Sequence, residues 1–368
     1  MSSYADYKCI LIFEEVDFMK ISRRILALCL CVVLVVAGSI LTFANFASDV
    51  NAGKGDGRNS KVENLEEFRD VLRDIVLEID GMGVLEEDEE TVSAVASNDS
   101  RKRNRTSATI SFKEDSIIRA EYSGGHLYYD IVDEGTMYFA DDGSFLINIL
   151  GSGIMDIDEG SVDQYLDFEL DFDLYFDKHG EAYIKYNTCN GIGFPVQMLN
   201  KWISVGSLSD RVSGYVGMDM LDYITATLAS TKGWFSLLGD YIDEYEDSID
   251  YDRSEDVYYF ENSIMEDFIK EVMNMQQANM EGVASISNFE LDKFDASMEI
   301  DLSDEETPSF LYQLNECEYT ANVDGYNIDY SCETVSKYEI TNIDNTVINI
   351  KNFEPYDMDE LLDMLVEG

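Results

Sequence analysis

Four aspartates in the middle of the chain have the spacing of a cation-binding loop: Asp156, Asp158, Asp163 and Asp167. Carboxylate oxygens are the ligands that Ca²⁺ prefers, and calcium loops place them at alternate positions. Gly160, however, stands at the fifth position of this stretch, whereas an EF-hand needs its glycine at the sixth. We therefore expect no cofactor, and Ca²⁺ held by these four aspartates is the alternative.

A second acidic pattern follows directly from Asp167 to Phe176, where apolar residues alternate strictly with four acidic residues and Tyr175. The apolar positions are Phe168, Leu170, Phe172, Leu174 and Phe176. This period of two predicts a strand with one apolar face and one face of carboxylates. Carboxylates on the same face lie about 7 Å apart, a separation at which a glycosidase could use a pair of acids. So regular a ladder is more typical of the solvated face of a sheet.

The cysteines allow one cross-link in an oxidising compartment. Cys317 and Cys332 bracket two strand-like runs, which would place them opposite one another in a hairpin. We therefore predict a disulfide between these two residues. Cys189 is then left over, and we interpret it as a small buried residue in a turn.

Residues that usually carry catalysis are scarce. The chain holds only two histidines, His126 and His179, and neither has a second ligand at zinc-binding spacing. It also lacks a nucleophile elbow, a phosphate loop and a metalloprotease helix motif. We predict no catalytic residues and a protein that is not an enzyme.

Strand and helix patterns divide the chain into three parts. From 106 to 150, short runs of β-branched and aromatic residues are separated by Lys-Glu-Asp, Ser-Gly-Gly, Asp-Glu-Gly and Asp-Asp-Gly, which are typical of turns. Helical spacing follows, above all from Val257 to Met280, and strand patterns return from 286 to 350. This order predicts an α+β fold, with a broad antiparallel sheet that packs helices on one face.

Large apolar side chains in the middle part are candidates for the lining of a ligand cavity between sheet and helices. They are Trp202, Trp234, Phe260, Ile264, Phe268 and Val272. The last four recur on one side of the helix expected from Val257 to Met280. The alternative is that they are ordinary core residues.

Charge restricts the partners. The chain has 75 Asp and Glu against 25 Lys and Arg, a formal net charge of -50. Nucleic acid and anionic membrane surfaces would be repelled by this charge. The hydrophobic content of 45% is too high for a disordered acidic chain, so most of the protein must fold.

The N-terminal part has the pattern of an export segment. Lys20, Arg23 and Arg24 precede an apolar run from Ile25 to Ala44, long enough to span a bilayer. The positive flank predicts that the N-terminus stays inside and the rest is exported. Cleavage after Ala52 and retention as an anchor both stay open, as do Met1 and Met19 as the start.

The sequence patterns together predict five regions in the chain. Residues 1–24 are a cytoplasmic extension, 25–44 a signal peptide or signal-anchor helix and 45–59 a linker. Residues 60–355 are an exported α+β domain and 356–368 an acidic tail. If the helix is uncleaved, the membrane is a partner through it; the oligomeric state is not determined by the sequence.

Short motifs resemble one known group. Asn200-Lys201-Trp202-Ile203 is similar to an element of extracytoplasmic proteins with the lipoprotein-carrier fold, and the runs 324–330 and 338–350 resemble that group's terminal strands. The group includes the periplasmic lipoprotein carrier and the lipid-binding lipoproteins of mycobacteria. The resemblance implies a strongly curved antiparallel sheet, an unclosed barrel, with helices on its concave face and a lipid bound between them. It implies no catalytic residues.

These observations together predict an exported or membrane-anchored protein of the bacterial cell envelope that binds a lipid or other apolar ligand without catalysis. The first alternative is an acidic surface module that binds a cationic partner or divalent cations. The second is a hydrolase with an unrecognised carboxylate site.

Overall fold

The computed structural model describes residues 53–54, 62–74, 107–123, 125–159, 162–191, 196–207, 237–279, 286–323, 326–351 and 353–357. The apolar run at 25–44, the regions on either side of it up to residue 52, and Trp234 lie outside these residues. In the part of the chain that is described, no helix is long and apolar enough to cross a membrane.

One antiparallel sheet of eleven strands dominates the structure, in the order β7-β6-β5-β4-β3-β2-β12-β11-β10-β9-β8. Its first strands in the chain are β2 (Ala108–Tyr122), β3 (Gly125–Phe139), β4 (Phe145–Glu159), β5 (Val162–Phe176), β6 (Ala182–Asn190) and β7 (Trp202–Ser204). Its later strands are β8 (Asp250–Asp252), β9 (Val257–Phe260), β10 (Ile286–Asp301), β11 (Ser309–Val323) and β12 (Tyr326–Thr341). A separate two-stranded sheet pairs β1 (Gly53–Lys54) with β13 (Thr346–Val347).

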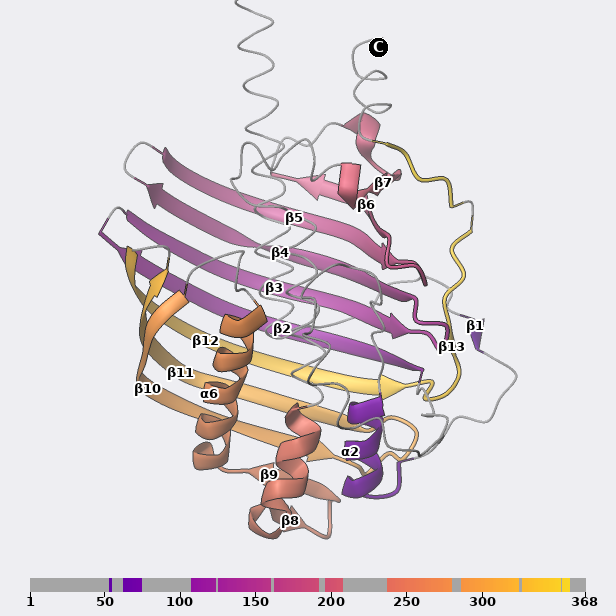
Figure 1. Ribbon diagram of the computed structural model, residues 1–368, viewed down its shortest axis with the longest axis vertical. Helices are drawn as coiled ribbons and strands as arrows, with labels where there is room; N and C mark the ends of the chain where they lie inside the picture. The colour runs from indigo at the N-terminus through magenta and orange to yellow at the C-terminus, as the bar shows by residue number, and fades with distance from the viewer. Residues whose placement is uncertain are drawn as a thin grey trace, which may run out of the picture.

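The large sheet consists of two meanders joined at their first and last strands. Strands β2 to β7 follow one another across one half, β8 to β12 across the other, and β12 pairs with β2 along nearly its whole length. Figure 1 shows the long strands of both halves crossing the molecule side by side. Among the described residues the strand order ends at β7 and β8, which do not pair with one another, so the sheet formed by these strands is unclosed. The expected broad antiparallel sheet is confirmed.

Two of the expected turns are instead the middles of long strands. Lys113-Glu114-Asp115 lies within β2, and Asp133-Glu134-Gly135 lies within β3, where these segments pair with one another. The prediction was wrong because Asp, Glu and Gly favour turns only locally, whereas here neighbouring strands on both sides bind the backbone groups. The strand with strict alternation is confirmed as β5, with Phe168, Leu170 and Phe172 buried on one face.

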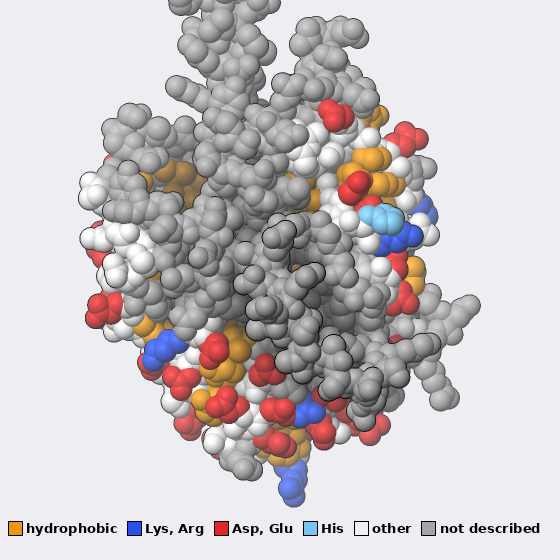
Figure 2. Space-filling view, viewed as in Figure 1, with side chains coloured by type: hydrophobic (Ala, Val, Ile, Leu, Met, Phe, Trp, Pro, Cys, Tyr) orange, Lys and Arg blue, Asp and Glu red, His pale blue; other side chains and the backbone are white. Residues whose placement is uncertain are grey.

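Three helical segments pack against one face of the sheet: α2 (Leu65–Asp74), a helix over 237–245 and α6 (Asn262–Asn279). Figure 1 shows them on the same side of the sheet, and Figure 2, from the same direction, shows acidic side chains gathered on the lower part of that face. The helix expected from Val257 to Met280 begins only at Asn262, because Val257–Phe260 forms strand β9 against β10. The two short 3-10 turns are η1 (Val196–Met198) and η2 (Glu246–Ser248).

The two faces of the sheet carry separate apolar clusters. We call the face under the helices the core face, because the main cluster joins its side chains to those of α2, α6 and the 237–245 helix. On the opposite, outer face a smaller cluster contains Tyr138, Tyr183 and Trp202, against which Ile350 and Phe353 pack. The backbone of Tyr356 exchanges hydrogen bonds with that of Trp202 and Ser204, and its side chain packs against the main cluster. The fold therefore includes Tyr356, one residue beyond the expected domain end.

Candidate functional site: a buried polar row on the core face

The register of the sheet brings four polar side chains into one line across the apolar core face. Tyr312 of β11 is opposite Ser336 of β12, Ser336 is opposite Glu114 of β2, and Glu114 is opposite Asp133 of β3. Each of these residues is at most 1% exposed. We call them the polar row. They come from strands far apart in sequence, so only the pairing of the two meanders assembles them.

Two hydroxyl groups hydrogen-bond the Glu114 carboxyl group. Ser116 donates from Oγ to Oε1 at 2.5 Å, and Ser336 donates from Oγ to Oε2 at 3.4 Å. Ser116 also shares a hydrogen bond of 2.9 Å with the hydroxyl of Thr334 on β12. All of these residues are buried. A buried carboxyl group held by neutral donors, with no cation among the hydrogen-bond partners the structure gives for it, is in an environment that disfavours its ionised form.

Burial is the main cause of a strongly perturbed pKa at Glu114. It raises the pKa of this carboxyl group well above its usual range, and the hydrogen bond from Ser116 offsets part of the rise. The adjacent carboxyl of Asp133 raises the pKa further. Two acids side by side in a low-dielectric core cannot both ionise cheaply. Glu114 is therefore set up to carry a proton, and to act as a hydrogen-bond donor as well as an acceptor.

Next to Asp133, several core-face positions of β3 and β4 are glycines. Gly151 of β4 is opposite Asp133, Gly135 is the next core-face position along β3, and Gly153 is the next along β4. Across β4 at this level, the first side chain is that of Leu170 on β5, two strand spacings or about 10 Å away. The polar row thus ends at two glycines of β4, whereas at Gly135 the ring of Phe112 takes the place of a side chain.

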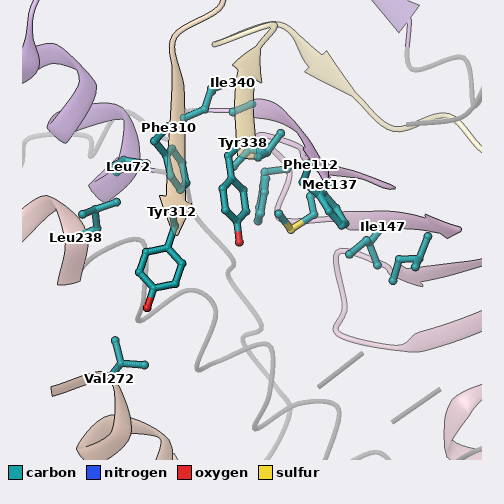
Figure 3. Close-up of a cluster of buried hydrophobic side chains, with 14 of the residues drawn as sticks. Leu72, Phe112, Met137, Ile147, Leu238, Val272, Phe310, Tyr312, Tyr338 and Ile340 are labelled. Carbon is teal, nitrogen blue, oxygen red and sulfur yellow. The ribbon is translucent and has the colours of Figure 1, made fainter. Parts of the chain in front are cut away.

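Apolar side chains surround the polar row on the helix side. Figure 3 shows Tyr312 and Tyr338 projecting from neighbouring strands, with Leu72 and Leu238 on one side of them. The Tyr312 hydroxyl points toward the side of the cluster where Val272 of α6 lies. Phe310 stacks on Tyr338 at a ring-centroid distance of 4.3 Å. The row is therefore a small set of polar groups inside a largely apolar layer.

The structure brings together four of the six predicted cavity residues. Phe260, Ile264, Phe268 and Val272 are all buried in the main cluster, and Phe268 meets Tyr241 edge to face at 5.3 Å. Trp202 does not join them. It lies in the cluster on the outer face, 5.7 Å from the Phe353 ring, because side chains alternate along β7 and its neighbour Ile203 takes the core side. The sixth, Trp234, lies outside the described residues.

The predicted calcium site forms a hairpin and not a loop. Asp156 and Asp158 belong to β4, Asp163 and Asp167 belong to β5, and Asp158 is opposite Asp163. These residues therefore lie along two extended strands, whereas a calcium loop curls its ligand residues around one point. Within the described ranges, no group of three or more His, Cys, Asp or Glu side chains could hold a metal ion.

The two cysteines predicted to pair lie opposite one another. Cys317 of β11 and Cys332 of β12 are direct cross-strand partners, as the hairpin pattern predicted, and both are thiols in this structure. The expectation of a turn at Cys189 was wrong: this residue lies in β6, opposite Leu170 of β5, and is a partly buried residue that packs against the main cluster.

The outer face of β5 is less solvated than its carboxylate ladder predicted. Asp173 is buried and forms an ion pair with Lys185 of β6. It also accepts hydrogen bonds from Asn148 at 2.7 Å and Asn187 at 3.2 Å. The Lys185 ammonium lies 5.1 Å from the centre of the Trp202 ring. This partly buried ion pair therefore lies beside the smaller cluster.

We predict that Lys185→Met destabilises the protein by about 1–3 kcal/mol, because it leaves the buried Asp173 carboxylate without its cation. The free energy of unfolding from a urea titration, followed by tryptophan fluorescence, measures the effect. Lys337→Met is the matched control, since Lys337 pairs with Glu339 on the surface and should change stability by less than about 0.5 kcal/mol. Equal effects of the two changes would contradict this account.

Comparison with known proteins gives little. No family model matches the chain, and no curated protein matches it. Among solved structures, the crystal structure of the outer membrane protein OprG from Pseudomonas aeruginosa aligns at 7% identity and a TM-score of 0.16, covering 64% of this chain and 95% of that one. A TM-score this low carries no argument about fold or function. The functional argument therefore rests on the residues themselves.

Proposed function

We propose that this is an exported protein of the bacterial cell envelope that binds a lipid or other apolar ligand, without catalysis, between the core face of the sheet and the helices. In this proposal the sheet curves around the ligand and the helices cover its concave side. The observation that carries the proposal is the polar row. Ligand sites are mostly apolar with a few convergent polar groups that fix orientation, and the row provides such groups in an otherwise apolar layer.

The chemistry of the row suggests which end of a ligand it would bind. A protonated Glu114 can donate as well as accept a hydrogen bond, and so can the hydroxyl groups of Ser336 and Tyr312. They suit an uncharged hydroxyl, ester or amide group, while the apolar chain would lie against residues such as Phe268 and Val272. In this proposal such a group would lie against the backbone of β4 at Gly151 and Gly153, which carry no side chains.

The envelope setting is supported by sequence. The basic cluster before the apolar run at 25–44 favours export of everything after it. In the proposal this segment either is removed or keeps the protein at the membrane, close to a source of lipid. The net charge of -50 keeps nucleic acid from being a partner.

One observation favours a hydrolase as the second candidate. Glu114 and Asp133 are adjacent carboxyl groups, and burial holds one of them toward its protonated form, as acid catalysis at neutral pH requires. Directly opposite side chains have Cβ atoms about 4.5–5.5 Å apart, which is near the separation in retaining glycosidases. Both groups are at most 1% exposed, however, and hydrolysis needs water at the reacting carbon.

Native mass spectrometry of the purified full chain, combined with organic extraction, tests the binding proposal. We expect a lipid to co-purify in a near-stoichiometric amount. Ser336→Ala should lower the recovered amount several-fold, because it removes one hydroxyl of the row, whereas Ser303→Ala, in an exposed turn, should leave it unchanged. A protein without extractable ligand, whose mass shifts only when Ca²⁺ is added, would reject the proposal in favour of the acidic surface module. Release of a sugar or an acid from the extract on incubation would favour the hydrolase.

A further inference from the structure

Cys317 and Cys332 lie next to the polar row but take no part in it. Cys332 is two residues before Thr334 on β12, and Cys317 is opposite it on β11. Both side chains face the core side, where Cys317 is buried and Cys332 is partly buried. No other described strand brings a cysteine near them, since four strands separate β12 from β6, which carries Cys189.

A β-bulge puts the two cysteines opposite one another. Leu314 pairs with Thr334, and continuing this register would place Glu316 opposite Cys332. The register shift between Leu314 and Cys317 moves Cys317 into that position instead. Glu316 then points outward, where it binds Lys293 at 3.1 Å. Because of this bulge, the residue opposite Cys332 is Cys317 and not Glu316.

The separation of such a pair suits a disulfide. Residues directly opposite in an antiparallel ladder have Cα atoms about 4.5 or 5.5 Å apart, depending on their place in the hydrogen-bond pattern. Disulfides span Cα separations of about 4.4–6.8 Å, so either value can be bridged without moving the strands. The thiols are already hydrogen-bonded to one another.

The hydrogen bond also makes the two thiols unequal. It lowers the pKa of Cys317, against the opposing effect of burial, and it raises the pKa of Cys332. The thiolate is the form that attacks a disulfide, so Cys317 is the first nucleophile of the pair.

We propose that Cys317 and Cys332 are a disulfide site, oxidised by exchange with the disulfide of an exported dithiol oxidoreductase. The Cys317 thiolate attacks one sulfur of the donor, forming a mixed disulfide and releasing the donor's second sulfur as a thiolate. The Cys332 thiolate then attacks Sγ of Cys317, and the donor's first sulfur leaves. The chain loses two electrons to the donor, and the protons of its two thiols end on the donor, which becomes a dithiol. The new bond joins β11 to β12 two core-face positions from the polar row and closes a short loop.

Differential alkylation with peptide mapping tests this on the purified full chain, equilibrated with oxidised glutathione as the donor. We expect a peptide that links Cys317 to Cys332, and a rise in Tm of roughly 5–10 °C over the reduced protein. Cys317→Ser should abolish both the link and the rise in Tm, whereas Cys189→Ser, the matched control, should keep both. Recovery of Cys317 and Cys332 as separate alkylated or glutathionylated residues would overturn the proposal. A link from either residue to Cys189, or an unchanged or lower Tm on oxidation, would overturn it equally.

Discussion

Gly135→Ala is expected to destabilise the protein by about 3 kcal/mol or more. A β-carbon at this position would lie 2.2 Å from the backbone oxygen of Asn148 and 2.8 Å from Cζ of Phe112. The first of these atoms belongs to the backbone of β4, which pairs with β3 and β5 on its two sides. It cannot move without breaking ladder hydrogen bonds, so the alanine would force the strands apart next to the polar row.

Thermal and urea unfolding followed by circular dichroism measure this effect. The matched control is Gly206→Ala, because among the described residues the nearest heavy atom to a β-carbon there is the Ser204 Oγ at 3.9 Å, an ordinary contact. That change should leave stability within about 1 kcal/mol or raise it slightly, since alanine restricts the unfolded chain. A Gly135→Ala protein as stable as the control would show that β3 and β4 are not as close as this account requires.

Glu114→Gln is expected to stabilise the protein at neutral and alkaline pH and to leave it nearly unchanged in acid. Glutamine has the shape of protonated glutamic acid and keeps an oxygen for the Ser116 hydroxyl to bond. It cannot ionise, so the variant does not bear the cost of a charge in the core. The difference between the two proteins therefore reports the free energy needed to ionise Glu114 in place.

The sign follows from proton linkage. Burial raises the pKa of Glu114 in the folded protein above its unfolded value, so the folded state holds the proton more tightly. Stability from this group is complete below the unfolded pKa and is lost as pH rises toward the folded pKa. Over that window the wild type should lose up to about 1.4 kcal/mol per pH unit relative to Glu114→Gln, and above it the difference should be constant.

Urea titrations at a series of pH values provide the measurement, with Glu121→Gln as the matched control. Glu121 lies on the same strand but is exposed on the outer face, so its variant should follow the wild type at every pH. A difference between wild type and Glu114→Gln that does not grow with pH would show that Glu114 ionises normally. The row would then lose the protonated donor on which the proposed mode of binding depends.

Strands could be predicted from the sequence where the side-chain period and the turn residues at the strand ends agreed. Strict alternation predicted β5 and its buried face, and the strands after residue 286 were expected as a run of antiparallel pairs. The opposition of Cys317 and Cys332 was predicted from a hairpin alone. The β-bulge that places these two cysteines opposite one another could not be predicted from the sequence, because the position of a bulge depends on the neighbouring strands.

The candidate site was missed for a physical reason that can be stated for each residue. Glu114 and Asp133 stand in tripeptides that favour turns, and as isolated segments those tripeptides have no partner strands. Once β12 and β4 flank β2 and β3, the same backbone is fully paired and its acids face the core. One signal was present: Phe112, Glu114, Ser116 and Ile118 share one parity, so a continuous strand would have placed an acid on an apolar face.

The sequence by itself determined the acidic charge, the basic cluster and apolar run that favour export, and the succession of strands, helices and strands. These depend on composition and on side-chain periods within single segments. Only the tertiary structure decided that β12 pairs with β2, that Trp202 faces away from α6, and that polar side chains from four strands form one row. Register between strands more than two hundred residues apart is fixed by the packing of the whole sheet, and a shift of one residue would send each of those side chains to the other face.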